Sequence, residues 1–167
     1  ISGVGYVATS VSKQYQNVSG NQNWTTSVQG TTQDYLAVRN LTMASGSFIT
    51  KEDIEHRNRV AVIGATVAKN LFGTNAIGQN VRINNAPYKV IGLLESKGQS
   101  AGGQDQDDTV IVPITTAQER LLGITNIQMI SIQATSADVI NQVQNDITVL
   151  LRSRHKLAFD KEDDFVV

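Results

Sequence analysis

The fold of this chain is decided by the stretch Arg59-Val60-Ala61-Val62-Ile63-Gly64-Ala65-Thr66-Val67-Ala68-Lys69-Asn70-Leu71-Phe72-Gly73. Residues 59–64 form a compact run of small and β-branched residues closed by a glycine, which is typical of a buried strand. Residues 65–72 carry their apolar side chains at helical spacing, on one stripe: Val67, Ala68, Leu71 and Phe72. Gly73 follows where a left-handed C-terminal cap belongs. The stretch therefore predicts a buried strand followed at once by a short helix.

Two further pairs of strands are predicted on either side of this unit. Residues 1–30 are rich in Val, Thr, Ser and Gln and are interrupted by the polar turn 19–23, which favours two extended segments. Residues 79–84 and 88–94 alternate apolar and polar side chains and are joined by Asn85-Ala86-Pro87. That pattern predicts a hairpin.

Two capping boxes mark predicted helix starts. Thr50-Lys51-Glu52-Asp53 has the required spacing and predicts a short helix that ends near Arg57. Thr116-Ala117-Gln118-Glu119 has the same spacing, and Gly123 is placed to end the helix that it opens.

The remaining segments complete an α+β pattern. Thr109–Pro113 is predicted to be a short strand, and residues 126–134 alternate well enough to form another. A long amphipathic helix is predicted over residues 136–154. Its apolar stripe consists of Val139, Ile140, Val143, Ile147, Leu150 and Leu151. Strands and helices are interspersed without a repeat, so the fold class is α+β.

Composition limits the possible functions. The chain has 167 residues, 40% of them hydrophobic, so it can bury a core. Its net charge is −1, from 14 basic and 15 acidic residues, and no global positive field exists to attract nucleic acid. The absence of cysteine excludes disulfides, thiolate zinc sites and thiol catalysis. No apolar run approaches the roughly 20 residues of a bilayer span.

No motif indicates catalysis or a cofactor. Gly3-Val4-Gly5 fits a loose dinucleotide fingerprint, but a strand does not precede it and a helix does not follow it. A phosphate-binding loop of the GxxxxGK[ST] type is absent. His56 and His155 have no second ligand at a suitable spacing. Three acids stand close together, Asp105, Asp107 and Asp108, and a solvated loop explains them better than a calcium site. We expect no enzyme activity, no cofactor and no metal.

Residues 96–108 are rich in glycine and polar residues and contain no apolar side chain larger than alanine. This pattern predicts a flexible exposed loop, and loops of such length are commonly functional. Its composition suits an adaptable polar rim of a protein contact. The expected contact residues are Gln99, Gln104, Asp105, Asp107 and Asp108.

Several short motifs follow one another in a specific order: Gly46-Ser47-Phe48, Glu52-Asp53, the run from Arg59 to Gly64, Val67-Ala68, Leu71-Phe72-Gly73, Ile77-Gly78-Gln79, Val90-Ile91-Gly92 and Val112-Pro113. Their order resembles the exterior core domain of MacB-like permeases, the MacB/FtsX family of ABC transporters. The resemblance continues through residues 151–155 to residues 163–165 and covers about three-quarters of the chain. Because the glycines stand at the ends of apolar runs, these motifs mark a fold and not an active site.

The resemblance implies two lobes. Residues 1–34 and 115–167 are expected to form a membrane-proximal α/β lobe, and residues 35–114 an inserted membrane-distal lobe of mixed β/α structure. Transmembrane helices would lie upstream of Ile1 and downstream of Val167.

The resemblance also implies a function at the cell membrane, with this domain on the extracellular or periplasmic side. The domain would couple cytoplasmic ATP hydrolysis to a membrane-fusion adaptor protein and to efflux of a peptide, toxin, antibiotic or lipid-like cargo. Its partners would be the adaptor, the ATP-binding part of the transporter and a second copy in a homodimeric permease. An FtsX-like module that regulates a cell-wall hydrolase and a lipoprotein-releasing permease are the alternatives.

Overall fold

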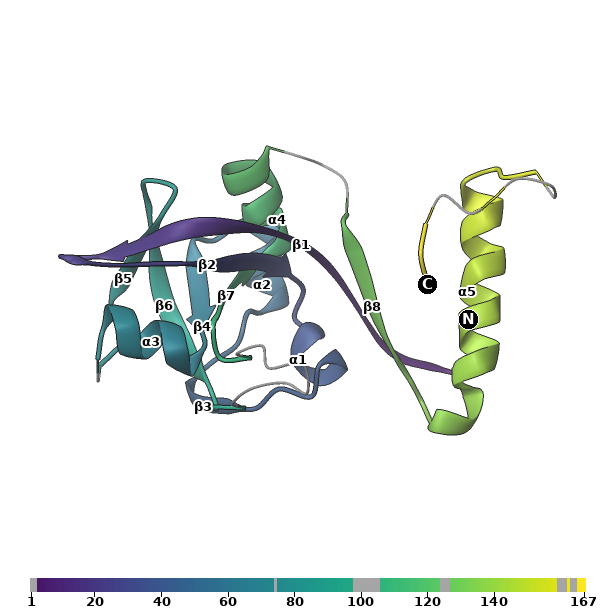
Figure 1. The fold of residues 1–167 in the computed structure, drawn as a ribbon, viewed down its shortest axis with the longest axis horizontal. Helices are drawn as coiled ribbons and strands as arrows, with labels where there is room; N and C mark the ends of the chain where they lie inside the picture. The colour runs from purple at the N-terminus through teal and green to yellow at the C-terminus, as the bar shows by residue number, and fades with distance from the viewer. Residues whose placement is uncertain (1–2, 74, 98–105, 124–126, 159–161, 163–164) are drawn as a thin grey trace. The chain divides into compact units, whose positions relative to one another are not determined.

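The fold is known from a computed structural model, which describes the chain except residues 1–2, 74, 98–105, 124–126, 159–161 and 163–164 (Figure 1). The chain divides into two compact units. Unit 1 comprises residues 1–7 and 132–167, and unit 2 comprises residues 8–131. Both helices and strands are present, which confirms the predicted α+β class.

Unit 2 is built around a closed ring of six strands. The strands are β1 (Val4–Ser19), β2 (Gln22–Thr31), β4 (Val60–Ile63), β5 (Asn80–Ile83), β6 (Ala86–Leu94) and β7 (Thr109–Pro113). They follow the order β2-β7-β4-β6-β5-β1, and a further pairing of β1 with β2 closes the ring. Two strands join from outside: β3 (Met43–Gly46) pairs with β6, and β8 (Met129–Ala134) pairs with β1.

The strands predicted in this part of the sequence are present. The ring joins strands from segments that were expected to lie in different lobes. β2 runs parallel to β7, with Ser27 opposite Thr109, and β1 pairs with β5, with Asn17 opposite Ile83. Residues 8–34 therefore share a sheet with strands of the segment 35–114. The contacts divide the chain after residues 7 and 131.

The ring strands direct the side chains of one face into a shared inner core. Because side chains alternate along a strand, the buried residues of all six strands fall into two sets. The inner set contains Val11, Val28, Ala61, Ile63, Val81, Ile83, Tyr88, Val90, Val110 and Val112. A second cluster lies on the other face, where Val62 and Ile111 pack with Tyr35, Phe48 and Ile49.

The strand and helix predicted from residues 59–73 are confirmed. β4 is followed by α3 (Ala65–Leu71), whose Val67, Ala68 and Leu71 are buried in the inner core. Gly73 has φ +78° and donates its amide to the carbonyl of Ala68, so it is the predicted left-handed cap.

The first capping box is confirmed, and the second is wrong. α2 (Lys51–Glu55) begins after Thr50, whose hydroxyl accepts from the Asp53 amide while the Asp53 carboxylate accepts from the Thr50 amide. The other helix begins earlier than predicted, as α4 (Ile114–Thr116), and continues as a π-helix η1 (Ala117–Leu122). The Thr116 hydroxyl donates instead to the carbonyl of Asn58, because a tertiary acceptor lies within reach.

Unit 1 consists of the start of β1, the end of β8 and a helical segment. The amide of Thr135 donates to the carbonyl of Gly3 at 2.7 Å. η2 (Ala137–Val139) leads into α5 (Ile140–Arg154), which matches the predicted helix. Within the predicted stripe Val143 is buried, whereas Ile140 and Leu150 are exposed.

No helix among the described residues is long and apolar enough to cross a membrane. The remaining short helix, α1 (Tyr35–Val38), lies in unit 2.

Candidate partner-contact site

The described ends of the 96–108 loop are tied to each other by one carboxylate. Asp107 Oδ2 accepts from the Ser96 hydroxyl at 2.7 Å, and Asp107 Oδ1 accepts from the Lys97 amide at 2.7 Å. Asp107 is 8% exposed. Bonds to an ionised carboxylate are stronger than neutral ones, so they fix the two ends of the loop beside each other.

The next residue anchors the same end of the loop to the β1–β2 hairpin. Asp108 Oδ1 accepts from the indole N–H of Trp24 at 2.8 Å, and the Asp108 carbonyl accepts from the Thr26 hydroxyl at 3.0 Å. The chain then enters β7 directly, and β7 runs beside β2.

The start of α3 supports the Asp107 backbone from the other side. The Thr66 amide donates to the Asp107 carbonyl at 3.2 Å, and the Gly64 amide donates to the Thr109 carbonyl at 2.9 Å. The described ends of the loop therefore lie at a hydrogen-bonded junction with β2, β4, α3 and β7.

The five predicted contact residues fall into two groups. Gln99, Gln104 and Asp105 lie outside the described residues. Asp107 and Asp108 are used within the chain, because their carboxylates accept hydrogen bonds from Ser96, Lys97 and Trp24. The prediction of an exposed loop is thus wrong at Asp107, whose burial depends on neighbours that are distant in the sequence. The sequence contained one signal that an acid of this loop has a structural role: Asp108 stands directly before the buried strand β7.

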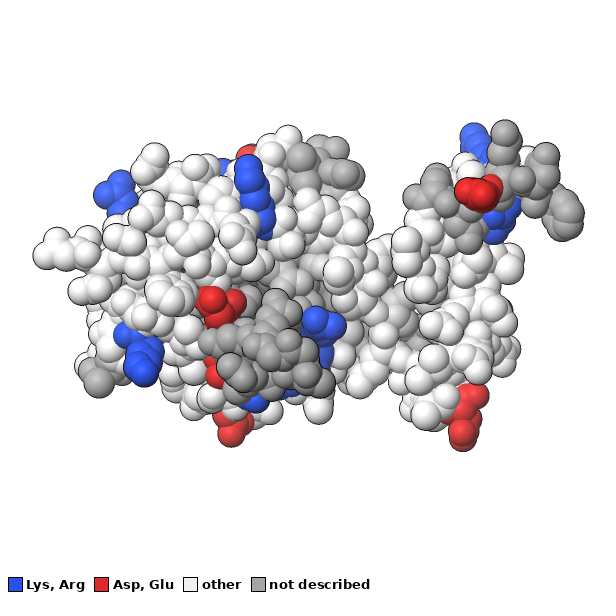
Figure 2. Space-filling model, in the orientation of Figure 1, with Lys and Arg blue, Asp and Glu red and all other residues white. Residues whose placement is uncertain are grey.

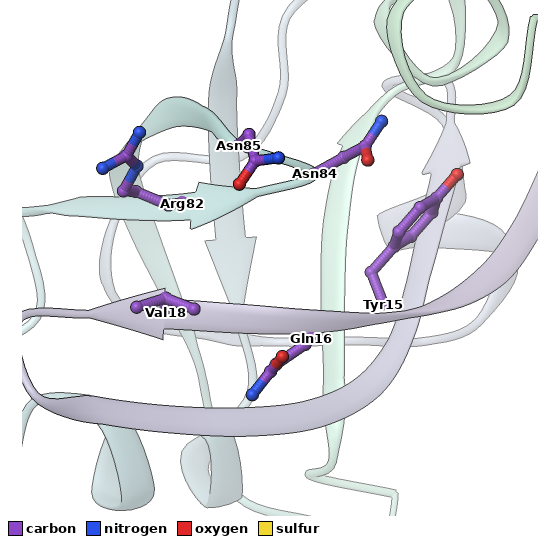
Figure 3. A pocket seen from close by; sticks show the side chains of 6 residues that line it. All are labelled: Tyr15, Gln16, Val18, Arg82, Asn84 and Asn85. Carbon is purple, nitrogen blue, oxygen red and sulfur yellow. The ribbon is translucent and has the colours of Figure 1, made fainter.

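A second feature of unit 2 is a shallow hollow of about 350 Å³ between β1 and the β5–β6 turn (Figure 3). Its lining residues are Tyr15, Gln16, Val18, Arg82, Asn84 and Asn85. In Figure 3 the Tyr15 side chain extends from β1 on one side of the hollow, and Asn84 lies at the end of β5 on the other side. The sequence pattern did not indicate this hollow, because it predicted the turn at residues 85–87. The turn residues are Asn84 and Asn85, since β6 begins at Ala86.

Two tyrosines near this hollow have a raised pKa. Burial raises the pKa of the Tyr15 hydroxyl, which donates to the Leu121 carbonyl at 2.6 Å. Burial also raises the pKa of Tyr88, and the nearby charges of Arg59 and Arg120 oppose that shift. The Tyr88 hydroxyl is buried in the core and has no hydrogen-bond partner among the described residues.

The other candidate residues occupy positions that belong to the fold and not to a binding site. Gly3 and Gly5 precede and begin a long strand, which is not the setting of a dinucleotide fingerprint. His56 caps the end of α2, and the His155 ring contacts Phe165 edge to face. Within the described part of the chain no three His, Cys, Asp or Glu side chains gather as a metal site would require. On the face shown in Figure 2, charged side chains are scattered among large uncharged areas.

Fold and site together define a class of protein: an α+β domain in which a ring of strands carries a loop whose described ends are tied together by Asp107. A model of the MacB-like periplasmic core domain matches residues 1–150. This chain belongs to that family, as its sequence motifs indicated.

Relatives named macrolide export ATP-binding/permease protein MacB are similar to this chain. The protein from Chlorobium phaeobacteroides is 40% identical over 149 residues, which is 89% of this chain and 22% of that protein. The protein from Bdellovibrio bacteriovorus is 39% identical over 165 residues, 98% of this chain and 25% of that protein. The chain thus spans a quarter or less of the length of these relatives.

Two solved structures have the same fold. The periplasmic region of MacB from Actinobacillus actinomycetemcomitans matches with a TM-score of 0.81 and 25% identity, over 93% of this chain and 70% of that one. The extracellular domain of the noncanonic ABC-type transporter YknZ from Gram-positive bacteria matches with a TM-score of 0.79 and 24% identity, over 93% of this chain and 78% of that one. The second likeness concerns the fold alone.

Proposed function

We propose that this chain is the exterior domain of an ABC-type export permease and that it couples cytoplasmic ATP hydrolysis to an adaptor protein and to cargo efflux. The domain would lie on the extracellular or periplasmic side of the cell membrane. The observation that carries the proposal is the family match over residues 1–150, together with relatives named as macrolide export proteins. The names of these relatives support export over the signalling and lipoprotein-releasing alternatives.

The contact with the adaptor is proposed for the loop that Asp107 closes. Gln99, Gln104 and Asp105 would meet the adaptor directly, while Asp107 and Asp108 hold the ends of the loop in position. A segment with fixed ends loses less conformational entropy on binding than one with free ends. The junction of β2, β4, α3 and β7 would then transmit force between the loop and the rest of the domain.

The ATP-binding part would belong to another segment or subunit, because this sequence has no phosphate-binding loop. The complete permease would act as a homodimer, since two nucleotide-binding parts that close on ATP need two copies of the permease. The cargo would be a peptide, a toxin, an antibiotic or a lipid-like molecule.

The test uses the full-length permease and its adaptor in a host that lacks its own exporters. Cells would be loaded with a fluorescent macrolide, an amphipathic peptide or a lipid analogue, and the rate of efflux would be measured. We expect efflux of at least one cargo that requires both proteins and that stops when the ATP-binding part is inactivated.

Two outcomes would contradict the proposal. If efflux were unchanged without the adaptor, coupling to an adaptor would be wrong. If loss of the protein altered cell-wall hydrolysis and moved no cargo, the signalling alternative would replace export. Titration of the isolated chain with ATP should give no saturable heat, and a saturable heat would place nucleotide binding on this chain.

A further inference from the structure

The hollow between β1 and the β5–β6 turn is lined by polar groups that the fold itself does not use. Among the described residues, the side chains of Gln16, Arg82, Asn84 and Asn85 make no hydrogen bond and no ion pair. The hollow that these residues line measures about 350 Å³. In Figure 3 the side chains of Arg82, Asn84, Asn85 and Tyr15 lie on one side of β1, and Gln16 lies on the other.

The turn that carries the two asparagines is conformationally costly. Asn84 has φ +52° and Asn85 has φ +65°, which is the pattern of a two-residue type I′ hairpin turn. Glycine is the favoured residue at the second of these positions, because a side chain in the left-handed region is sterically disfavoured. Asparagine at both positions keeps two amide groups on a rigid turn at the edge of the hollow.

The lining of the hollow carries one charge, and it is positive. None of its six lining residues is acidic, and Arg82 carries a guanidinium. Outside the lining, the Lys13 ammonium lies 5.7 Å from the centroid of the Tyr15 ring. The Tyr15 ring is held in place because its hydroxyl donates to the Leu121 carbonyl.

We propose that this hollow binds a small ligand that carries a carboxylate beside further hydrogen-bonding groups. Arg82 pairs with the carboxylate, for which its planar fork of donors is suited. The amides of Asn84 and Asn85 bind the neighbouring donors and acceptors of the ligand, and the Tyr15 ring forms an apolar wall. The free carboxyl end of a short peptide and an acidic sugar both present this chemistry. The inference is independent of the proposed export function.

The test compares carboxylates with their neutral amides. Full-length protein in detergent would be titrated by calorimetry with N-acetyl-dialanine and with glucuronic acid, and then with the corresponding carboxamides. The 167-residue chain would serve as a second sample, with its fold checked by circular dichroism. Because the hollow is shallow, we expect a weak affinity, with a Kd on the order of 1 mM. The carboxamides should bind about tenfold more weakly.

Three variants connect the binding to this hollow. Arg82→Gln should weaken binding of the acid about tenfold, because it removes the charge and keeps a polar side chain. Asn85→Gly should also weaken binding, while the melting temperature stays equal or rises, since glycine relieves the turn. Lys51→Gln removes an exposed cation on α2 and should change nothing.

Each possible result either identifies the class of ligand or overturns the proposal. Binding of the peptide alone identifies a peptide end as the ligand, and binding of the sugar alone identifies an acidic sugar. Equal binding of both supports recognition of the carboxylate without preference for its source. Absence of saturable binding of either acid overturns the proposal, and so does an equal loss of affinity in Arg82→Gln and Lys51→Gln.

Discussion

The carbonyl oxygen of Asp107 lies against the α-carbon of Gly64, so closely that a β-carbon built there would be 2.1 Å from that oxygen. The φ of Gly64 is −79°, which every residue can adopt, so the requirement for glycine is steric and not conformational. The close approach lets the Gly64 amide reach the Thr109 carbonyl and the Thr66 amide reach the Asp107 carbonyl. The end of β4 and the end of the loop thus share one packed junction.

Gly64→Ala should destabilise the domain by about 1–3 kcal/mol, as overpacking of a rigid site does. The change is measured as a shift in the urea midpoint of unfolding. Gly5→Ala is the comparison, because a β-carbon there would meet the Gln133 carbonyl only at 3.3 Å. If both variants lost the same stability, the close approach at Gly64 would have no special cost.

The two large residues at the end of α3 should differ in their contributions. Leu71 is 4% exposed within the inner core, whereas Phe72 is partly buried and packs against that core from its edge. Leu71→Ala is therefore expected to cost about 2–5 kcal/mol, and Phe72→Ala less, because its cavity opens toward solvent. Chemical denaturation of both variants measures the difference. Equal losses would mean that Phe72 is as well packed as Leu71.

The sequence predicted local elements well where the signal was local. The strand and helix of residues 59–73 follow from periodicity and a terminal glycine, and both are present. The Thr50–Asp53 capping box is real because its donors and acceptors all lie within four residues. The same spacing at Thr116–Glu119 failed, because the Thr116 hydroxyl bonds to Asn58 across the fold.

Long-range structure could not be predicted in the same way. The ring depends on pairings such as Ser27 with Thr109, and no local pattern specifies which strands become neighbours. The burial of Asp107 depends on Ser96 and Lys97 meeting it, and the hollow depends on β1 reaching the β5–β6 turn. Composition alone favours a solvated loop, so the structural role of Asp107 could not be predicted from it.

Replacement of Tyr88 by phenylalanine should be tolerated and should change the response to alkaline pH. The hydroxyl is buried without a partner, and such a group costs about 1–3 kcal/mol, so Tyr88→Phe should leave stability at pH 7 unchanged or raise it. Burial raises the Tyr88 pKa above its ordinary value of 10.0, so the folded state holds this proton more tightly than the unfolded state. Stability is then fully present below the unfolded pKa and declines as the pH rises through the folded pKa.

Urea unfolding of the wild type and the variant at pH 7 and at alkaline pH measures this effect, and the variant should lose less stability at alkaline pH. Tyr15→Phe is the matched control. Because its hydroxyl donates to the Leu121 carbonyl, that variant should lose about 1 kcal/mol at pH 7. A similar loss at pH 7 in Tyr88→Phe would show that the buried hydroxyl has a partner.

The final prediction concerns the loop and depends on the proposed adaptor contact. A Gly-Ser linker in place of residues 99–105 should leave folding intact, because Asp107 and its bonds to Ser96 and Lys97 are retained. The full-length permease should then bind its adaptor less tightly and export more slowly, by a moderate factor since the removed residues are polar. Asp107→Ala is the comparison: it should lower the melting temperature, because it leaves the Ser96 and Lys97 donors without their acceptor. If the linker variant kept full adaptor affinity and full export, the loop would be a spacer, and the contact would lie elsewhere on the domain.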